Sequence, residues 1–358
     1  MPSIAVSWIL ARMDSHDDVE RPRRVTINDI AAATGFASST VSRALSRPGR
    51  VNPVTRRRIE AVAREMSYVP NTQAGAHTPG RTETIAVMVS DVTNPFYFDL
   101  IRGTQHQLKA AGYANLLLDS ENSGELESHM LSKVRRSIDG AILTASRLSG
   151  RLLATLDADL PLVAINRRVH GVQSVVIDSP SGVRQAAEHL ISLGHREIVY
   201  LSGPENSWAN EARWRSLSTV AGQHGLSARR LGPFPADRMS GSAAADALIN
   251  TGATACITFN DLLAINMLAR LDERGVGVPR EISIVGCDDI FGSDFCHPSL
   301  TTLTAPGEQV GRVAVSMLLA RLENGASATR RSAVLPTHLT VRESTGPAPR
   351  QGCSTRGS

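Results

Sequence analysis

The stretch RVTINDIAAATGFASSTVSRALSRPGRVNPVTRRRIEAVAREMSYVPN, at residues 24–71, limits the possible folds of this 358-residue chain most strongly. Thr26 followed three residues later by Asp29 is a capping-box pattern, in which the two side chains close the first turn of a helix. Gly35 favours a left-handed helix end. The pattern predicts a short helix over residues 27–34, followed by a sharp turn.

Two further helices are predicted after this turn. Over residues 38–46, Val41 and Leu45 are spaced to face inward, while the opposite edge is polar. Asn52 followed by Pro53 indicates the start of a third helix. Its apolar positions repeat at helical spacing and are Ile59, Val62, Ala63 and Met66. Such a bundle is a helix-turn-helix whose second helix could enter the major groove of DNA. The alternative is a three-helix scaffold with a solvated polar face.

Charge favours the DNA-binding interpretation. Residues 21–81 carry 11 Arg against three acids, a net charge of +8, whereas residues 1–20 carry −3 and residues 82–358 carry −1. The whole-chain charge of +4 therefore conceals a basic head on a nearly neutral body. Arginine suits both the neutralisation of backbone phosphates and bidentate contact with guanine. The expected partner is double-stranded DNA.

Composition excludes several classes of protein. With 42% hydrophobic residues the chain can bury a large core, yet no apolar run reaches the roughly 18 to 20 residues that span a bilayer. The four cysteines show no CxxC spacing and no histidine partners at zinc-finger intervals, so no metal site is predicted. The apolar start lacks the basic region of a signal peptide, and Met13 is an alternative to Met1 as the start. We expect a cytoplasmic protein without a membrane partner.

The pattern changes after residue 81 to an alternation of strand and helix. Short apolar runs typical of strands occupy residues 84–90, 114–119, 140–145, 162–166, 174–178, 197–203, 255–260 and 282–289. Helices are predicted between or after them, among them residues 180–193, 208–224, 261–274 and 308–322. This alternation predicts an α/β fold of doubly wound parallel sheets. Roughly 255 residues are large for one sheet, so two α/β subdomains with a cleft between them are expected.

Polar residues follow several predicted strands at their carboxyl ends, where open α/β sheets bind ligands. Asn166, Asn260 and Asp288 each stand directly after an apolar run. One such residue is as often a helix cap, but several at one edge favour a binding cleft. Enzyme signatures are mostly missing, since the chain has no GxGxxG, no phosphate loop ending in Gly-Lys-Ser/Thr, no HExxH and no GxSxG. Neither catalysis nor a cofactor is predicted.

A basic head followed by a two-lobed cleft domain resembles the LacI/GalR family of bacterial transcription repressors. The resemblance extends from residue 24 to about residue 343. It rests on VTINDIAAATGFASSTVSRALS and RRRIEAVAREMSYVPN in the head, and on DVTNPFYFDLIRG, LGHREIVYLSGP, FND, VPREISIVGCDD and HPSLTTL in the body. It implies a sequence-specific repressor with a periplasmic-binding-protein-like body, whose operator affinity changes when a small molecule, expected to be a saccharide, closes the cleft.

The resemblance also implies roles for single residues. Those implied to read the major groove are Ser38, Ser39 and Arg43, and those implied to contact phosphates are Thr26, Ser42 and Arg50. The hinge adds Asn71 and His77 as further DNA contacts. The implied effector contacts are Asn166, Arg215, Asn260 and Asp288, with Phe96 as an apolar wall. A polyhydroxylated sugar needs such donors and acceptors over an apolar floor.

Three departures from the family pattern bear on these roles. Ala37 replaces the usual serine before the groove-reading helix, which weakens that cap unless Ser38 takes over. Residues 74–77 read Ala-Gly-Ala-His where the family has Ala-Arg-x-Leu, so the leucine wedged into the minor groove is missing and weaker operator bending is expected. After Arg215, the usual glycine-aromatic pair is replaced by the Ser-Thr pair at residues 218–219.

The predicted domain order is a disordered leader over residues 1–22, a helix-turn-helix domain over 23–70, a linker over 71–83, an effector-binding and dimerisation body over 84–343, and a disordered tail over 344–358. A homodimer is expected because two heads must meet the palindromic half-sites of an operator about one helical turn apart. The tail has no leucine heptad, so no tetramerisation helix is predicted. The alternatives are a stand-alone sugar-binding protein and a nucleotide-binding α/β enzyme.

Overall fold

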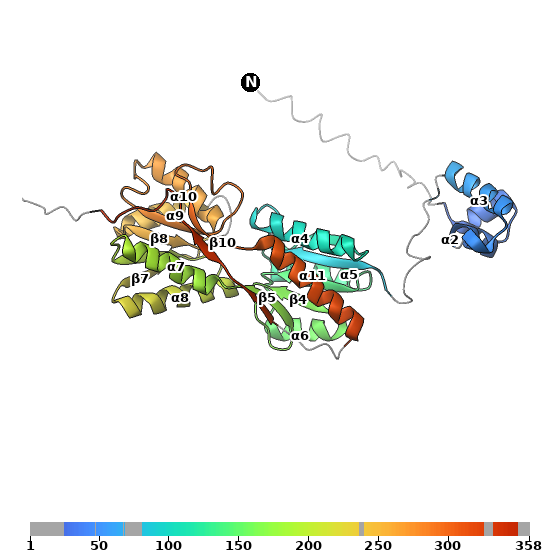
Figure 1. The fold of residues 1–358 in the computed structure, drawn as a ribbon, viewed down its shortest axis with the longest axis horizontal. Helices are drawn as coiled ribbons and strands as arrows, with labels where there is room; N and C mark the ends of the chain where they lie inside the picture. Colours follow the sequence, from blue (N-terminus) through green and yellow to red (C-terminus); the bar gives the residue numbers. More distant parts are fainter. Residues whose placement is uncertain are drawn as a thin grey trace, which may run out of the picture. The chain divides into compact units, whose positions relative to one another are not determined.

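The chain divides into two compact units, Met1–Arg81 and Thr82–Ser358 (Figure 1). The computed structural model describes residues 25–46, 48–66, 68, 81–235, 240–325 and 332–349. Among these residues no helix combines the length and the apolar character needed to cross a membrane.

The first unit is the predicted helical head. It contains α1 (Ile27–Thr34), α2 (Ser38–Ser46), a short 3-10 turn η2 (Pro48–Arg50) and α3 (Pro53–Glu65). Both halves of the Thr26–Asp29 capping box are present, and Gly35 ends α1 with a φ of 74°. The Asn52 side chain accepts the backbone N–H of Val54 at the start of α3. The buried core of the head consists of Ile30, Val41, Ala44, Ile59 and Ala63. The three predicted helices are thus confirmed.

The second unit contains two six-stranded sheets, one in each of two lobes. Lobe 1 has the strand order β11-β5-β4-β3-β1-β2 and lobe 2 the order β12-β10-β9-β8-β6-β7. Neighbouring strands pair in parallel, except for the antiparallel pair of β10 and β12. The strands of lobe 1 are β1 (Thr84–Val89), β2 (Ala114–Asp119), β3 (Gly140–Thr144), β4 (Leu162–Ile165), β5 (Gln173–Ile177) and β11 (Ser332–Leu335). Those of lobe 2 are β6 (Glu197–Leu201), β7 (Ser227–Leu231), β8 (Ala255–Thr258), β9 (Ser283–Asp288), β10 (Thr301–Thr304) and β12 (His338–Thr340).

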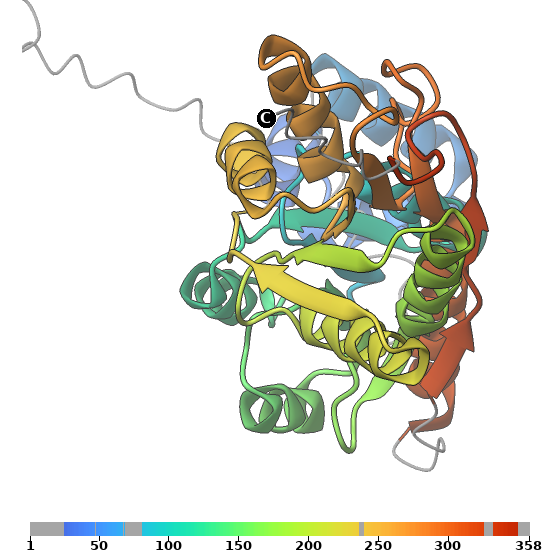
Figure 2. The ribbon, with the colours of Figure 1, turned by 90° about the vertical axis from the view of Figure 1, so that its left-hand side faces the viewer.

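Helices cover both faces of each sheet, as a doubly wound fold requires. In lobe 1, α4 (Phe96–Ala110) and α11 (Gly307–Asn324) pack on one face, and α5 (Gly124–Val134) and α6 (Gly150–Asp159) pack on the other. In lobe 2, α9 (Ser240–Thr251) and α10 (Asp261–Glu273) cover one face, and α7 (Ser179–Ser192) and α8 (Trp208–His224) cover the other (Figure 2). Buried apolar side chains of the strands fill the space beneath each layer.

The chain passes between the lobes after β5, after β10 and after β11 (Figure 1). The sequence pattern predicted β1 to β6, β8 and β9, and it missed β7, β10, β11 and β12. Edge strand β7 reads SARRL, and the other three are only three or four residues long. Short or polar runs of this kind lack the continuous apolar signal of a buried parallel strand. The correction matters because β10, β11 and β12 flank two of the connections between the lobes.

Two predicted boundaries of the body also need correction. Asp139 accepts hydrogen bonds from the backbone N–H of Thr82 at 2.6 Å and of Glu83 at 2.9 Å, so the body begins before the predicted residue 84. At the other end, Ser344 is fully buried and its hydroxyl donates to the carbonyl of Ile284 at 2.6 Å. Residues 344–349 therefore belong to the body and not to a disordered tail. This segment is held by polar contacts, so its order could not be predicted from the periodicity of apolar residues.

Buried His195 holds this terminal segment. Its Nδ1 lies 2.8 Å from the hydroxyl of Thr254, and its Nε2 donates to the carbonyl of Gly346 at 3.1 Å and lies 3.0 Å from the hydroxyl of Ser283. Burial lowers the pKa of His195 below its usual 6.5, although the Gly346 carbonyl acts in the opposite direction. A lowered native pKa means that protonation favours the unfolded chain.

We therefore expect the free energy of unfolding of the body to be highest above about pH 6.5 and to fall as the pH is lowered through the native pKa of His195. The total loss is about 1.4 kcal/mol for each unit between the native and unfolded pKa values. Urea denaturation between pH 7.5 and 5 measures this slope. His195→Gln should flatten it, and replacement of the exposed His224 by Gln should not. Equal slopes for the wild type and His195→Gln would contradict the assignment.

Candidate functional site

The outer edge of α2 is the candidate DNA-reading surface of the head. Ser39 and Arg43 are exposed on it, and the guanidinium Nε of Arg43 donates to the carbonyl of Ser39 at 3.0 Å. Ser38 is also exposed, and its hydroxyl donates to the side-chain carbonyl of Asn28 at 2.8 Å. That bond ties α2 to α1. Ala37 offers no side-chain cap, and the first turn of α2 instead uses its carbonyl, which accepts the N–H groups of Thr40 and Val41.

The residues predicted to contact phosphates surround this edge. Thr26 and Arg50 are exposed, and Ser42 is half-buried. Thr26 is already engaged in the capping box, where its hydroxyl donates to Asp29 at 2.7 Å, so a phosphate there would also meet the positive end of the α1 dipole. Arg57 adds exposed positive charge on α3. The two predicted hinge contacts, Asn71 and His77, lie outside the described residues.

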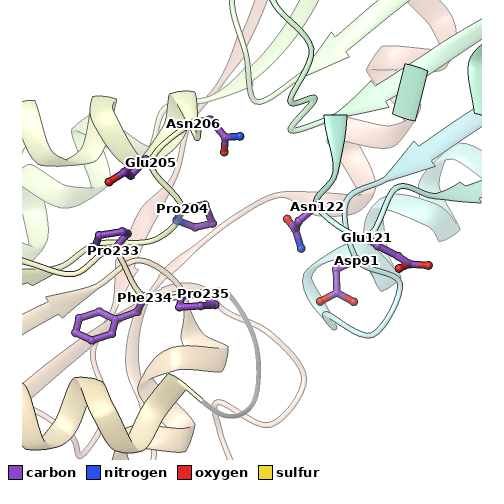
Figure 3. A pocket seen from close by; sticks show the side chains of 9 residues that line it. All are labelled: Asp91, Glu121, Asn122, Pro204, Glu205, Asn206, Pro233, Phe234 and Pro235. Atoms are coloured by element: carbon purple, nitrogen blue, oxygen red, sulfur yellow. The ribbon is translucent and has the colours of Figure 1, made fainter. Parts of the chain in front are cut away.

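The second candidate site lies between the lobes of the body. A cavity of about 750 Å³ has walls from both lobes, at the carboxyl ends of their strands. The residues that line it are Asp91, Glu121 and Asn122 from lobe 1 and Pro204, Glu205, Asn206, Pro233, Phe234 and Pro235 from lobe 2. In Figure 3 the amides of Asn122 and Asn206 point into the space between the walls, whereas Glu121 and Glu205 point away from the opposite wall. The cavity therefore combines neutral donors and acceptors with a proline-rich wall.

A buried ion pair stands at the carboxyl end of β9 in lobe 2, although neither of its residues lines this cavity. Arg213 is only 6% exposed, and its Nη2 donates to Oδ1 of Asp288 at 3.2 Å. Its Nη1 donates to the carbonyl of Phe259, and its guanidinium lies over the Phe259 ring at 5.4 Å. The absence of a side chain at Gly203 leaves room for that ring, since a Cβ there would lie 2.3 Å from it. Burial raises the pKa of Asp288 to about 7, and the attraction of Arg213 opposes the rise.

Backbone strain gathers at the same strand ends. Positive φ angles, which residues other than glycine rarely adopt, occur at Asn166 (φ 56°), Asp288 (φ 120°) and Ala145 (φ 48°). Each stands at the carboxyl end of a strand, after β4, within the end of β9 and after β3 respectively. Strain of this kind concentrates where a surrounding structure holds a binding group in place.

The other predicted effector contacts lie near these ends in structural roles. Asn166 Oδ1 accepts the backbone N–H of Ile177 at 3.2 Å, and Asn260 Oδ1 accepts that of Leu263 at 3.0 Å as the cap of α10. Phe96 begins α4 and meets the ring of Tyr97 edge-on, with centroids 5.1 Å apart. None of the predicted effector residues is among those that line the cavity of Figure 3.

Arg215 does not join the cleft. It is exposed on α8, where its Nε donates to the carbonyl of Glu211 and its side chain lines an outer groove with Arg184 and Trp208. The arginine that pairs with Asp288 is Arg213, two residues earlier. If the family's arginine corresponds to Arg213, the pair that replaces its glycine and aromatic residue is Ser216-Leu217 and not residues 218–219. Leu217 is fully buried. A sequence signal for Arg213 existed, because it shares a helical stripe with buried residues, namely Asn210, Leu217, Val220 and Ala221.

Two residues on the lobe 1 side, Tyr97 and Arg147, were not predicted. Burial raises the pKa of Tyr97, while the charge of Arg147 lowers it and that of Asp288 raises it. The phenol of Tyr97 therefore stands within electrostatic range of a cation from lobe 1 and an anion from lobe 2. Arg147 follows β3 and donates from Nη2 to Oδ1 of Asn122 at 3.1 Å. None of the motifs that resemble the family includes residue 147, so Arg147 was not identified as a candidate site residue.

In the described parts of the chain, no three His, Cys, Asp or Glu side chains come together as a possible metal site. Cys256 and Cys287 are fully buried thiols, and burial raises the pKa of both.

Comparison with known protein families agrees with this arrangement. The model described as "Bacterial regulatory proteins, lacI family" matches residues 26–71, and the model described as "Periplasmic binding protein-like domain" matches residues 187–345. The first match covers the helical head and the second covers most of lobe 2.

Similar proteins match nearly the whole chain. The HTH-type transcriptional regulator CelR of Thermobifida fusca is 31% identical over 342 residues, covering 91% of this chain and 100% of that protein. The HTH-type transcriptional repressor CytR of Escherichia coli K12 is 29% identical over 334 residues, covering 90% and 97%. The solved complex of the transcriptional regulator CelR with cellobiose has a TM-score of 0.66 and 29% identity, and the match covers 90% of this chain and 100% of that one.

Proposed function

Since the chain belongs to the LacI family, we propose that it represses transcription from a palindromic operator. It is a DNA-binding transcriptional regulator with an effector-binding domain. In our proposal, a saccharide or related polyhydroxylated metabolite binds between the lobes and changes the affinity for the operator. Members of this family regulate transcription and are not enzymes. The site of action in this proposal is the cytoplasm, where chromosomal DNA is reached.

The observation that carries the effector proposal is the buried pair of Arg213 and Asp288 at the cleft. A paired carboxylate and guanidinium together accept and donate hydrogen bonds to adjacent hydroxyls, and this bidentate geometry favours polyols. The amides of Asn122 and Asn206 add further donors and acceptors from both walls. Cellobiose in the similar CelR complex supports a saccharide ligand.

A ligand in this position can transmit its binding to the DNA because it contacts both lobes. Lobe 1 receives the chain from the linker, where Thr82 and Glu83 are bound by Asp139. A ligand that binds the closed lobes more tightly than the open ones shifts the population toward closure by its differential affinity. We propose that this shift changes the spacing of the two heads of a dimer on the operator.

The experiment that tests the effector proposal is a screen of neutral sugars, sugar acids, sugar phosphates and nucleosides by thermal shift on the full-length protein. A ligand at 100 times its dissociation constant stabilises the native state by about 2.7 kcal/mol, which is easily detected. Each stabilising compound is then tested for release or tightening of operator DNA. A protein that binds sugars with no change in operator affinity would instead be a sugar-binding protein.

The proposed dimer uses apolar surface exposed on the body. Phe291 and Phe295 form an exposed edge-to-face pair on the loop after β9, with centroids 5.0 Å apart, and Phe98 on α4 is half exposed. Exposed aromatic clusters of this kind favour a protein interface.

We expect Phe291→Ser combined with Phe295→Ser to shift the protein toward monomer in light scattering at micromolar concentration, with operator affinity falling at least about tenfold because the second head no longer binds cooperatively. Leu117→Ser, on edge strand β2 of lobe 1, is the matched control. An unchanged dimer mass in the double variant would remove the loop from the interface.

A further inference from the structure

A second cavity continues the cleft beside the first. It has a volume of about 690 Å³, and its lining includes Arg147, Ser128, His129, Ser149 and the exposed carboxylate of Glu125 from lobe 1 together with Asn206 of lobe 2. The two cavities are contiguous in two ways. Asn206 lines both of them, and Asn122 of the first accepts a hydrogen bond from Arg147 of the second. One ligand can therefore reach from the Asn122–Asn206 gap to Arg147.

The guanidinium of Arg147 forms no ion pair with any residue that the structure describes. Among the described residues no carboxylate lies within ion-pair distance of its guanidinium, and its buried Nε has no hydrogen-bond partner. The nearest acid, Glu127, uses Oε2 to accept the backbone N–H of Arg147 at 2.9 Å, and not the guanidinium. Burial raises the pKa of Glu127, which favours its neutral form. Burial also lowers the pKa of Arg147; the charges of Tyr97 and Glu127 oppose this change, and that of Arg167 adds to it.

This arrangement contrasts with the other cleft arginine. Arg213 is paired one to one with Asp288, so its charge is already compensated within the protein. Arg147 is left with one neutral acceptor, Asn122, and an unused N–H. A half-buried cation in such an environment is stabilised by an anion that arrives from solvent. Of the three acids that line the first cavity, Glu121 and Glu205 point away from the opposite wall (Figure 3). Among the described residues, neither they nor Asp91 form an ion pair with Arg147.

We infer that the effector is an acidic saccharide, whose carboxylate or phosphate binds Arg147 while its hydroxyls contact the amides of Asn122 and Asn206. The inference rests on the proposed function and specifies its ligand class. Ser128, Ser149 and His129 line the same cavity and supply further donors to the anion. A neutral sugar of the same shape leaves Arg147 uncompensated, so it binds more weakly.

The test uses the full-length protein and matched pairs of compounds in isothermal titration calorimetry. The pairs are glucose with glucuronate, galactose with galacturonate, cellobiose with cellobionate, and ribose with ribose 5-phosphate. At least one acid is expected to bind at least about 100-fold more tightly than its neutral partner. Tighter binding in the uronate and cellobionate arms identifies a carboxylate, and tighter binding in the phosphate arm identifies a phosphate. Equal or tighter binding of the neutral members throughout overturns the inference.

Variants at position 147 separate charge from packing. Arg147→Gln should lose at least about 30-fold in affinity for the acid, keep the affinity for its neutral partner, and reduce the salt dependence of acid binding, whereas Arg147→Lys should retain part of the preference. Arg136→Gln removes an exposed arginine from the same lobe and should change nothing. Without ligand, Arg147→Gln should melt at or above the wild-type temperature, because it removes an uncompensated charge.

The two proposals fail in different ways. An unchanged acid preference in Arg147→Gln overturns the inference about Arg147 and leaves the effector function standing. Failure of every compound, acidic or neutral, to alter operator binding would count against the proposed effector function itself.

Discussion

Replacement of Arg43 by alanine is expected to abolish the preference for operator over random DNA while leaving the head folded. Arg43 is exposed on the edge of α2, where its guanidinium lies along the helix and bonds only to Ser39 among the described residues. Those weak local bonds are easily exchanged for the O6 and N7 acceptors of a guanine. A bidentate contact of this type discriminates by roughly 1 to 3 kcal/mol. Two half-sites give about 2 to 6 kcal/mol, or about 30-fold to 10⁴-fold in operator affinity.

Competition binding to operator and random duplexes measures this effect, and circular dichroism of the variant checks the fold. The matched control is Arg57→Ala, because Arg57 is an exposed arginine of the same head. Arg56 is less suitable, since its charge is offset by Glu60 at 3.2 Å. Loss of a phosphate contact should weaken both duplexes equally and reduce the salt slope by about one. If Arg43→Ala kept its preference for the operator, the assignment of Arg43 to base reading would be wrong.

The head could be predicted from sequence almost completely because its information is local. The capping box at Thr26, the glycine at Gly35 and the Asn52-Pro53 start each determine a helix end through residues no more than three positions apart. Strands β1 to β6, β8 and β9 of the body could be predicted equally well, since they are continuous apolar runs. Strands β7, β10, β11 and β12 were not, because their pairing partners, and not their own composition, make them strands.

The location of the cleft could be predicted from the sequence better than the residues that form it. Polar strand ends indicated the correct edge of each sheet, and Asp288 lies there in the described structure. The family resemblance, however, assigned the arginine of the effector site to Arg215. The pattern of buried residues along α8 indicates Arg213 instead. Tyr97 and Arg147 of lobe 1 were missed, because Tyr97 meets the charges of Arg147 and Asp288 only after strands from distant parts of the chain are brought together. Electrostatic complementarity across a cleft is not encoded in any single segment.

Replacement of Arg213 is expected to eliminate the effector response, whereas replacement of Arg215 leaves it intact. Arg213 is buried against Asp288 and Phe259 at the cleft, and Arg215 is exposed on the opposite face of α8. A truncation that leaves one member of a buried, hydrogen-bonded charge pair unpaired typically costs 2 to 5 kcal/mol or more of binding energy. Arg213→Met should therefore weaken the effector by at least about 30-fold, measured by calorimetry and by operator release, with operator affinity in the absence of effector unchanged.

Loss of Arg213 alone also leaves Asp288 buried without its partner, which destabilises a folded protein by about 3 to 5 kcal/mol. The double variant Arg213→Met with Asp288→Asn removes both charges and should recover most of that stability without recovering the effector response. Arg215→Met changes the same residue type two positions away on the same helix and should match the wild type in melting temperature, effector affinity and operator release. An effector response that survives in the double variant, or one that disappears in Arg215→Met, would return the binding role to the face of α8 that the family spacing had selected.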